Sequence, residues 1–265
     1  MSELIVNRRE GRVQHLVLNS PETRNQLTFA ACRALVAGMQ DADRDPEAGA
    51  ILISANGPIF CTGMDPRELG RPEAAELGWI HEDLFTMGSR ITTPVVCQVQ
   101  GAVTGAGVGL LCNAHIVVAA QGTTFGLTEV RHANWPFMIF RSLALALGER
   151  RALELALTGR MFGANEALQY GLIHAVSIPI ELEDRVQSIL QVLTGASPEV
   201  LRRSLDFVHQ TRDVGWKEAG LLAQQVRTGW FAHPDFLEGQ AAAAENRKPK
   251  WPSLQGKGAP MEEGK

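Results

Sequence analysis

Two continuous apolar runs on either side of a glycine-dense segment constrain this chain most. The runs are 94–99 (PVVCQV) and 115–119 (HIVVA), and 50–54 (AILIS) has the same character. Continuous apolar strands are typical of parallel sheets that are covered on both faces, because no residue has to alternate toward water. With a helical pattern over 29–42 among these runs, the sequence predicts an α/β fold built from ββα units.

The second half of the chain has a different pattern. Strand-like runs at 4–7 and 13–18, joined by a hairpin at Glu10 and Gly11, open the chain, but from Pro136 onward the pattern is helical. The predicted C-terminal helices cover 181–194, 198–211, 216–230 and 235–247. We therefore predict an α/β core over 1–195, a helical region over 196–252 and a disordered, Gly-, Lys- and Glu-rich tail over 253–265.

Charge and cysteine usage exclude several classes of protein. The 25 Lys and Arg residues against 29 Asp and Glu give a net charge of −4, so we expect no nucleic-acid partner. No run approaches the roughly 18 apolar residues of a membrane span, and 1–12 has no apolar stretch of a secretory signal. The four cysteines lack zinc-ligand spacing. The sequence thus predicts a cytoplasmic protein with reduced thiols, no metal and no membrane partner.

The glycine-dense segment 101–109 (GAVTGAGVG) is not a nucleotide-binding loop. Leu110 stands where a dinucleotide fingerprint needs its third glycine, and no Lys-Ser/Thr pair follows as in a P-loop. What remains is a tight turn into a helix N-terminus, where free N–H groups favour a developing negative charge. Close packing of a helix on a strand also requires glycine, so both interpretations stay open.

The loop 59–65 also runs from a buried strand into a helix. We expect Asp65 to be the N-cap, Pro66 the first helical residue and Glu68 the partner of a capping box. Two such junctions side by side would offer two N–H donors to one oxygen, which is the geometry of an oxyanion hole. The spacing does not establish that the two loops meet, and a plain connecting loop is the alternative.

Glu129 is the first candidate for acid–base chemistry. It follows a short strand-like run at 123–126 among apolar residues, an environment that raises the pKa of a carboxyl group. The alternative is a surface glutamate paired with Arg131.

Six segments in order resemble the crotonase superfamily of CoA-thioester enzymes. They are 18–25 (LNSPETRN), 60–65 (FCTGMD), 101–109, 125–129 (FGLTE), 157–172 and 238–251. The resemblance implies a spiral of ββα repeats and a helical C-terminal region that assembles a homotrimer or homohexamer. It also implies an acyl-CoA thioester substrate, with coenzyme A entering as part of the substrate and no separate cofactor.

The resemblance implies a role for seven residues. Glu129 would be the catalytic base, and the N–H groups of Met64 and Ala106 would form the oxyanion hole. The residues that would bind CoA are Arg24 and Thr62 within the chain, with Arg247 and Lys250 reaching the CoA of a neighbouring subunit.

One departure from the family pattern favours a particular reaction. Enoyl-CoA hydratases of this superfamily carry a second glutamate at the position of Gly109, where this chain has no carboxylate. Hydration with one carboxylate should be slower by orders of magnitude, whereas moving a double bond needs only one base. We therefore predict enoyl-CoA isomerisation. The alternatives are a one-glutamate hydratase, an inactive acyl-CoA binder and a CoA-ester hydrolase.

A second departure follows Glu129. Hydratases have a glycine-rich turn there, whereas this chain has Trp135 and Phe137. These rings would fill the water site, line the acyl pocket, or pack against the neighbouring helix, and the sequence does not decide among these. His132 is a candidate acid or base, with a loop histidine of no catalytic duty as the alternative. Glu68 and Glu73 are further carboxylates that would reach the site from the loop after Met64.

Overall fold

The computed structural model describes residues 3–69 and 77–255, and its centre is a six-stranded sheet. Its strands, in spatial order, are β1 Ile5–Glu10, β2 Val13–Leu18, β3 Ala50–Ala55, β4 Val95–Val99, β6 Ile116–Ala120 and β9 Ala175–Ser177. Only β1 and β2 pair antiparallel, through the hairpin predicted at Glu10 and Gly11. All other neighbours are parallel, as the apolar runs predict.

The burial of both sheet faces explains those apolar runs. Leu182, Val186 and Leu190 of α9 (Leu182–Gly195) form one cluster with alternate residues of β3, β4 and β6. On the other face, the remaining strand residues pack with α1 (Phe29–Arg44) in the main core. Neither face of the central strands meets water, so the residues on both faces are apolar.

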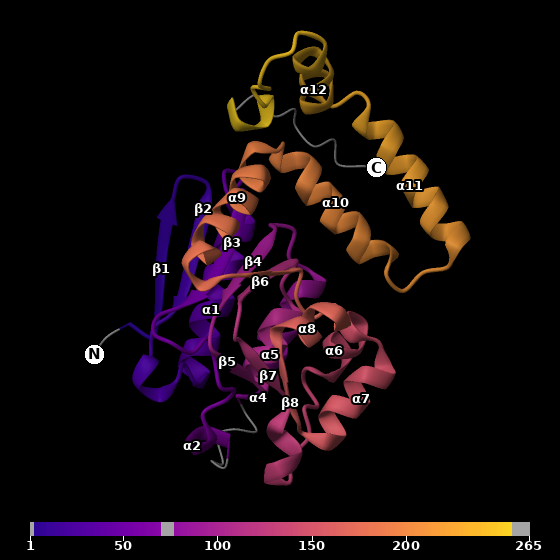
Figure 1. Cartoon of the computed structure of the whole chain (residues 1–265). Helices are drawn as coiled ribbons and strands as arrows, with labels where there is room; N and C mark the ends of the chain where they lie inside the picture. The colour runs from indigo at the N-terminus through magenta and orange to yellow at the C-terminus, as the bar shows by residue number, and fades with distance from the viewer. Residues whose placement is uncertain (1–2, 70–76, 256–265) are drawn as a thin grey trace.

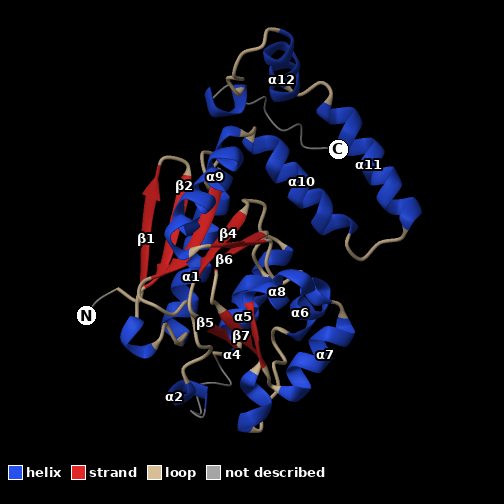
Figure 2. Ribbon diagram, in the orientation of Figure 1, coloured by secondary structure: helices blue, strands red, loops and turns tan. Residues whose placement is uncertain are grey.

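A second, three-stranded sheet contains β5 Ala102–Thr104, β7 Thr124–Gly126 and β8 Met161–Gly163. Figure 2 shows its strands below the larger sheet. The prediction of an all-helical pattern after Pro136 is wrong at β8 and β9. A three-residue strand has no readable periodicity, and these strands form only because distant partners pair with them, as Phe125 does with Phe162.

Short helices surround the two sheets and connect their strands. The α-helices are α2 Pro66–Leu69, α4 Gly78–Phe85, α5 Ala106–Cys112, α6 Phe140–Leu147, α7 Glu149–Thr158 and α8 Ala164–Tyr170. The 3₁₀ turns are η1 Pro21–Thr23, η2 Met87–Ser89, η3 Thr128–His132 and η4 Pro179–Glu181. Among these connections, α5 and η3 matter most here, because each follows a strand of the small sheet directly.

The C-terminal helices leave the core, as Figure 1 shows. They are α10 Pro198–Thr211, α11 Trp216–Trp230 and α12 Pro234–Ala244, followed by η5 Pro252–Gln255. The first two match the predicted segments, whereas α12 ends before 247. Ser253 donates to the buried carboxylate of Asp235, so the ordered chain runs past the predicted start of the tail at 253. The rest of that tail, 256–265, lies outside the described residues, as does Glu73.

Candidate active site

The two glycine-containing loops meet, which the sequence alone left open. Cys61 of the first loop forms a parallel bridge with Val103 of β5, and the N–H of Thr104 donates to the carbonyl oxygen of Cys61 at 3.0 Å. A Cβ atom placed on Gly63 would lie 3.7 Å from the nitrogen of Ala106. The two strand-to-helix junctions are therefore packed against each other.

Each loop presents one unpaired backbone donor beside this contact. Ala106 is the first residue of α5, where a helix leaves its N–H groups without internal partners. Within the described chain, neither the N–H of Ala106 nor that of Met64 donates to a protein acceptor. Gly105 enables the turn with φ +54°, a region that a side chain would strain. Two free donors on adjoining loops are what an oxyanion hole requires.

The carboxylate of Glu129 reaches this junction from η3. Its Oε1 atom would lie 3.0 Å from a Cβ atom on Gly105, and its Oε2 atom is buried with no hydrogen-bond partner in the described chain. Burial raises the pKa of Glu129 above its ordinary value, and its own backbone N–H and the charge of His132 partly offset this. A buried carboxyl group with a raised pKa and an unpaired oxygen is chemically suited to take and return a proton.

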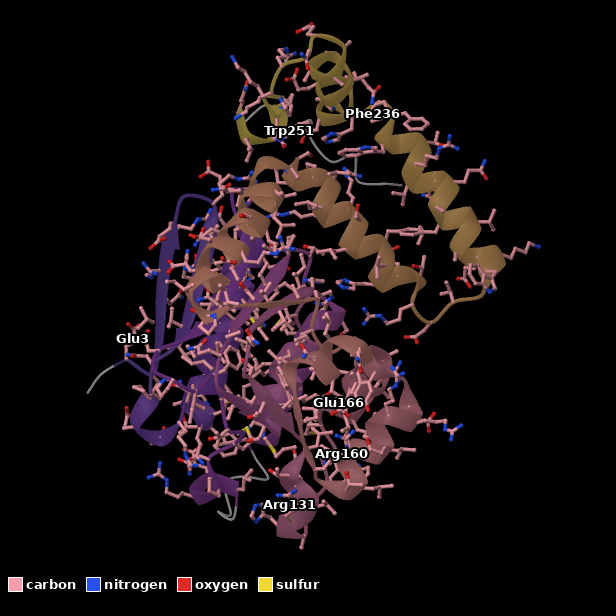
Figure 3. The ribbon with its side chains drawn as sticks, in the orientation of Figure 1. Glu3, Arg131, Arg160, Glu166, Phe236 and Trp251 are labelled. Carbon is pink, nitrogen blue, oxygen red and sulfur yellow. The ribbon has the colours of Figure 1, made fainter. Side chains whose placement is uncertain are left out.

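The alternative of a Glu129–Arg131 surface pair is wrong. No hydrogen bond or ion pair joins the two side chains in the part of the chain that is described. The Arg131 side chain instead lies 3.3 Å from the position of a Cβ atom on Gly159, at the C-terminal end of α7. Figure 3 shows Arg131 at the lower edge of the molecule.

A cavity of about 440 Å³ adjoins Glu129 and the two loops. It brings together seven of the predicted site residues, namely Thr62, Met64, Ala106, Glu129, His132, Trp135 and Phe137. Glu129 is the only acidic side chain among its described lining residues. The part of the lining that the structure describes therefore offers one carboxylate to a ligand.

Gly109 does not line this cavity, contrary to the prediction that it belongs to the site. A Cβ atom at Gly109 would lie 2.4 Å from Cγ2 of Ile139 and 3.0 Å from Cδ1 of Phe85. Both residues are buried and both line the cavity. Ile139 therefore occupies the space that a side chain at position 109 would enter. The sequence reasoning missed Ile139, because nothing local relates it to the glycine segment.

The two aromatic residues after Glu129 differ in environment. Trp135 is half-buried and lies 5.5 Å from the ring of Phe140, so it both packs against α6 and lines the cavity. Phe137 is 76 % exposed, so the alternative of helix packing is wrong for this residue. The atoms nearest to a Cβ atom at Gly109 belong to Ile139 and Phe85, not to Trp135 or Phe137.

The predicted helix cap is confirmed, but the predicted capping box is wrong. Oδ1 of Asp65 accepts a hydrogen bond from the N–H of Arg67 at 2.9 Å. Oε2 of Glu68 accepts from the N–H of Phe29 at 2.6 Å, at the start of α1. Its carboxylate thus stabilises the N-terminus of another helix, where the helix dipole favours an anion, and Glu68 is not among the described cavity residues.

The residues predicted to bind CoA separate into two pairs. Thr62 lines the cavity and donates its N–H to the carbonyl oxygen of Arg24 at 3.2 Å, which sets the exposed Arg24 beside it. Arg247 instead pairs with Glu238 at 2.6 Å, and the same carboxylate accepts from the N–H of Lys250. This second pair belongs to the C-terminal region, at the top of Figure 1. Within one chain it does not line the cavity.

His81 of α4 is a cavity residue to which the sequence assigned no role. Its ring stacks on that of Phe29 with 4.6 Å between centroids. No sequence signal points to it, because its position is set by how α4 packs.

The four cysteines are free, and the described residues hold no group of three or more metal-ligating side chains. Within the described chain, no helix is long and apolar enough to span a bilayer.

Comparison with known proteins identifies relatives along nearly the whole chain. The enoyl-CoA hydratase/isomerase family matches residues 8–254. Enoyl-CoA hydratase domain-containing protein 3, mitochondrial, of Danio rerio is 30 % identical over 260 residues, covering 94 % of this chain and 88 % of that protein. Trans-2-decenoyl-acyl-carrier-protein isomerase of Streptococcus mutans is 30 % identical over 264 residues, covering 94 % and 97 %.

Solved structures agree with this relationship. The crystal structure of human enoyl-CoA hydratase domain-containing protein 3 superposes with a TM-score of 0.89 at 27 % identity, covering 94 % of this chain and all of that one (100 %). The crystal structure of an enoyl-CoA hydratase from Bacillus anthracis gives a TM-score of 0.88 at 25 % identity, covering 94 % and 99 %. The crotonase-like α/β fold with a helical C-terminal region is thereby confirmed.

Proposed function

The chain belongs to the enoyl-CoA hydratase/isomerase family, and from this premise we propose that it moves the double bond of an enoyl thioester from the 3- to the 2-position. One observation carries the proposal. Glu129 is the only carboxylate among the described cavity residues, and the apolar Ile139 occupies the space beside Gly109. These groups support reversible proton transfer by one base, with no second carboxylate among the described lining residues.

The reaction needs only the groups at the loop junction. Glu129 takes a proton from C2 of the 3-enoyl thioester, and the electrons move through the double bond and the thioester carbonyl to give a dienolate. The N–H groups of Met64 and Ala106 hold its oxygen. Glu129 then returns the same proton at C4, which leaves the double bond between C2 and C3 and regenerates the carboxylate. The raised pKa of Glu129 supports both steps, since a carboxylate with a higher pKa is a stronger base toward the proton at C2.

Hydration is a second candidate function with one observation in its favour. His132 lines the cavity, and its charge acts on Glu129. A histidine can take over the acid or base duty of a missing carboxylate. Against this stands Ile139, which offers no hydrogen bond to a water molecule beside Gly109.

We extend the proposal to the thioester carrier. Arg24 and Thr62 lie together next to the cavity, and we propose that they contact the phosphates and pantetheine of CoA. A relative's name specifies an acyl-carrier protein, so acyl-CoA and acyl-carrier-protein thioesters both need testing.

We propose that the protein assembles as a homotrimer or homohexamer. We also propose that it is located in the cytoplasm and acts in fatty acid metabolism. The assembly would be built through α11, which has no buried residue within one chain and whose Trp216 is 96 % exposed. There, Arg247 and Lys250 of one subunit would approach a neighbour's CoA.

The deciding experiment incubates the purified protein with 3-hexenoyl-CoA and, separately, with 2-hexenoyl-CoA, and follows products by mass and ultraviolet absorbance. We expect the 3-enoyl compound to become conjugated without a change in mass. Glu129→Gln should abolish the conversion, and Arg131→Gln, whose side chain lies away from the cavity, should retain it.

The other outcomes are equally clear. A gain of one water on the 2-enoyl compound would make the protein a hydratase and would overturn the isomerase proposal. Release of free CoA would make it a hydrolase. Tight binding of both compounds without conversion, unchanged by Glu129→Gln, would make it an acyl-CoA binder.

A further inference from the structure

His81 makes no hydrogen bond to the part of the chain that the structure describes, although it lines the cavity. Neither ring nitrogen bonds to another atom of the described chain, and the Nε2 atom is buried. A neutral imidazole carries one donor and one acceptor, and no protein atom of the described chain uses either capacity of His81. Leaving a buried polar group unpaired destabilises the folded state, and an apolar ring would stack on Phe29 without that cost.

Other histidines of the chain have evident structural duties, which sets His81 apart. Nδ1 of His115 accepts from the N–H of Val95 at 2.9 Å, and Nδ1 of His174 accepts from the N–H of Val117 at 3.0 Å. Each of these rings joins neighbouring strands of the large sheet. His81 hydrogen-bonds through neither nitrogen in the described chain, so its stacking on Phe29 does not explain a polar ring at this position.

Three apolar residues line the cavity together with His81, and these four residues are here called the acyl wall: His81, Phe85, Met138 and Ile139. The ring of Phe85 lies 6.4 Å from that of His81, and Phe85 and Ile139 both contact the position of a Cβ atom on Gly109. His81 is the only polar side chain of this wall. A few polar groups in an otherwise apolar pocket decide which ligand fits and in which orientation.

We propose that His81 is a specificity-determining residue, which hydrogen-bonds an oxygen atom carried on the acyl chain of the substrate. The cavity would then select hydroxyacyl or oxoacyl thioesters over unsubstituted ones. The inference rests on the proposed function, in that the acyl group of a thioester has to lie along the acyl wall while its carbonyl oxygen meets Met64 and Ala106.

The state of the ring decides which kind of oxygen it prefers. Burial lowers the pKa of His81 below its ordinary value, and the charge of Glu68 offsets this only in part. The ring is therefore neutral at neutral pH and favours a hydroxyl or keto oxygen over a carboxylate. Rotation of the ring by half a turn about its Cβ–Cγ bond keeps it stacked on Phe29 and exchanges nitrogen and carbon positions. Either nitrogen can thus turn to the ligand.

The test measures binding rather than turnover, so that it does not depend on which reaction the protein catalyses. Isothermal titration compares hexanoyl-CoA with its 5-hydroxy, 6-hydroxy and 5-oxo derivatives, all saturated and therefore inert to double-bond chemistry. We expect the wild type to bind at least one oxygenated compound about tenfold more tightly than hexanoyl-CoA. His81→Phe should abolish this preference and leave the Kd of hexanoyl-CoA within about twofold.

Two further variants make the result specific to His81. His81→Gln, which keeps a donor and an acceptor, should retain part of the preference. Arg131→Gln changes a side chain that does not line the cavity and should leave the preference intact. Thermal unfolding separates a structural role, because we expect His81→Phe to be at least as stable as the wild type.

Three results would overturn the proposal: no preference for any oxygenated compound, a preference that survives His81→Phe, or a loss of stability in that variant. If the preference holds while 3-hexenoyl-CoA is not isomerised, the assignment of His81 stands and the proposed reaction fails.

Discussion

At the thioester end of the cavity, the groups available to a ligand are the N–H groups of Met64 and Ala106 and the carboxylate of Glu129. Along the acyl wall they are the side chains of Phe85, Met138 and Ile139, with one histidine. The first end lies where strands of the small sheet run into short helical turns, so its donors are backbone groups held by the fold. The acyl wall consists of side chains, which can change without disturbing the loops. Under the proposed function, backbone groups and one carboxylate would stabilise and form the enolate, whereas the acyl wall would select the substrate.

The largest effect should come from the carboxylate. We expect Glu129→Gln to lower kcat for isomerisation about 1,000-fold, because general base catalysis is lost, while the Kd for hexanoyl-CoA changes little. His132→Gln, at the same end of the cavity, should change kcat less than about fivefold. Steady-state kinetics and titration check both, and equal losses in the two variants would contradict a single-base mechanism.

A backbone donor of the thioester end can be removed by Ala106→Pro. Proline is tolerated at the first position of a helix and has no N–H group, so α5 should form while the oxyanion hole loses one donor. We expect kcat/KM to fall about 300-fold. Ala106→Gly keeps the N–H group and serves as the control. Equal activities in the two variants would show that the Ala106 N–H group does not act on the substrate.

The acyl wall can be tested by placing a glutamate at position 109, where hydratases of the superfamily carry a second carboxylate. Gly109→Glu alone should not produce hydration, because its Cβ atom would lie 2.4 Å from Ile139, and overpacking should lower Tm by about 5 °C. Gly109→Glu combined with Ile139→Ala should recover stability and add measurable hydration of 2-hexenoyl-CoA. Hydration by the single variant would show that Ile139 does not close the space beside Gly109.

The smallest effect is a stability change at the thioester end. The pKa of Glu129 is raised in the folded state. The contribution of Glu129 to the free energy of unfolding is therefore fully present below the pKa that it has in the unfolded chain, and it is lost as the pH rises through the pKa of the folded state. Glu129→Gln should therefore raise Tm by about 2 °C at pH 8, with no gain at pH 4. Thermal unfolding at the two pH values checks this, and a gain that is the same at both would contradict burial of the ionised carboxylate.

The sequence by itself determined what depends on neighbours along the chain. The buried parallel strands were predictable from continuous apolar runs, the cap at Asp65 from residue type, and α10 and α11 from helical spacing. The two glycine-containing loops and Glu129 could be named as candidate site residues, because each follows a strand and a strand-to-helix turn constrains residue types over only a few neighbouring positions.

Only the tertiary structure decided which distant residues share a space. The contact of Ile139 with the position of Gly109, the bond from Phe29 to Glu68 and the place of His81 in the cavity join segments with no local relation. The short strands β5, β8 and β9 likewise exist only through their partners. Secondary structure follows from interactions within a few residues of the chain, whereas the filling of a cavity depends on packing between segments. For that reason the candidate base and several of its neighbours in the cavity could be named from the sequence, whereas Ile139 and His81 could not.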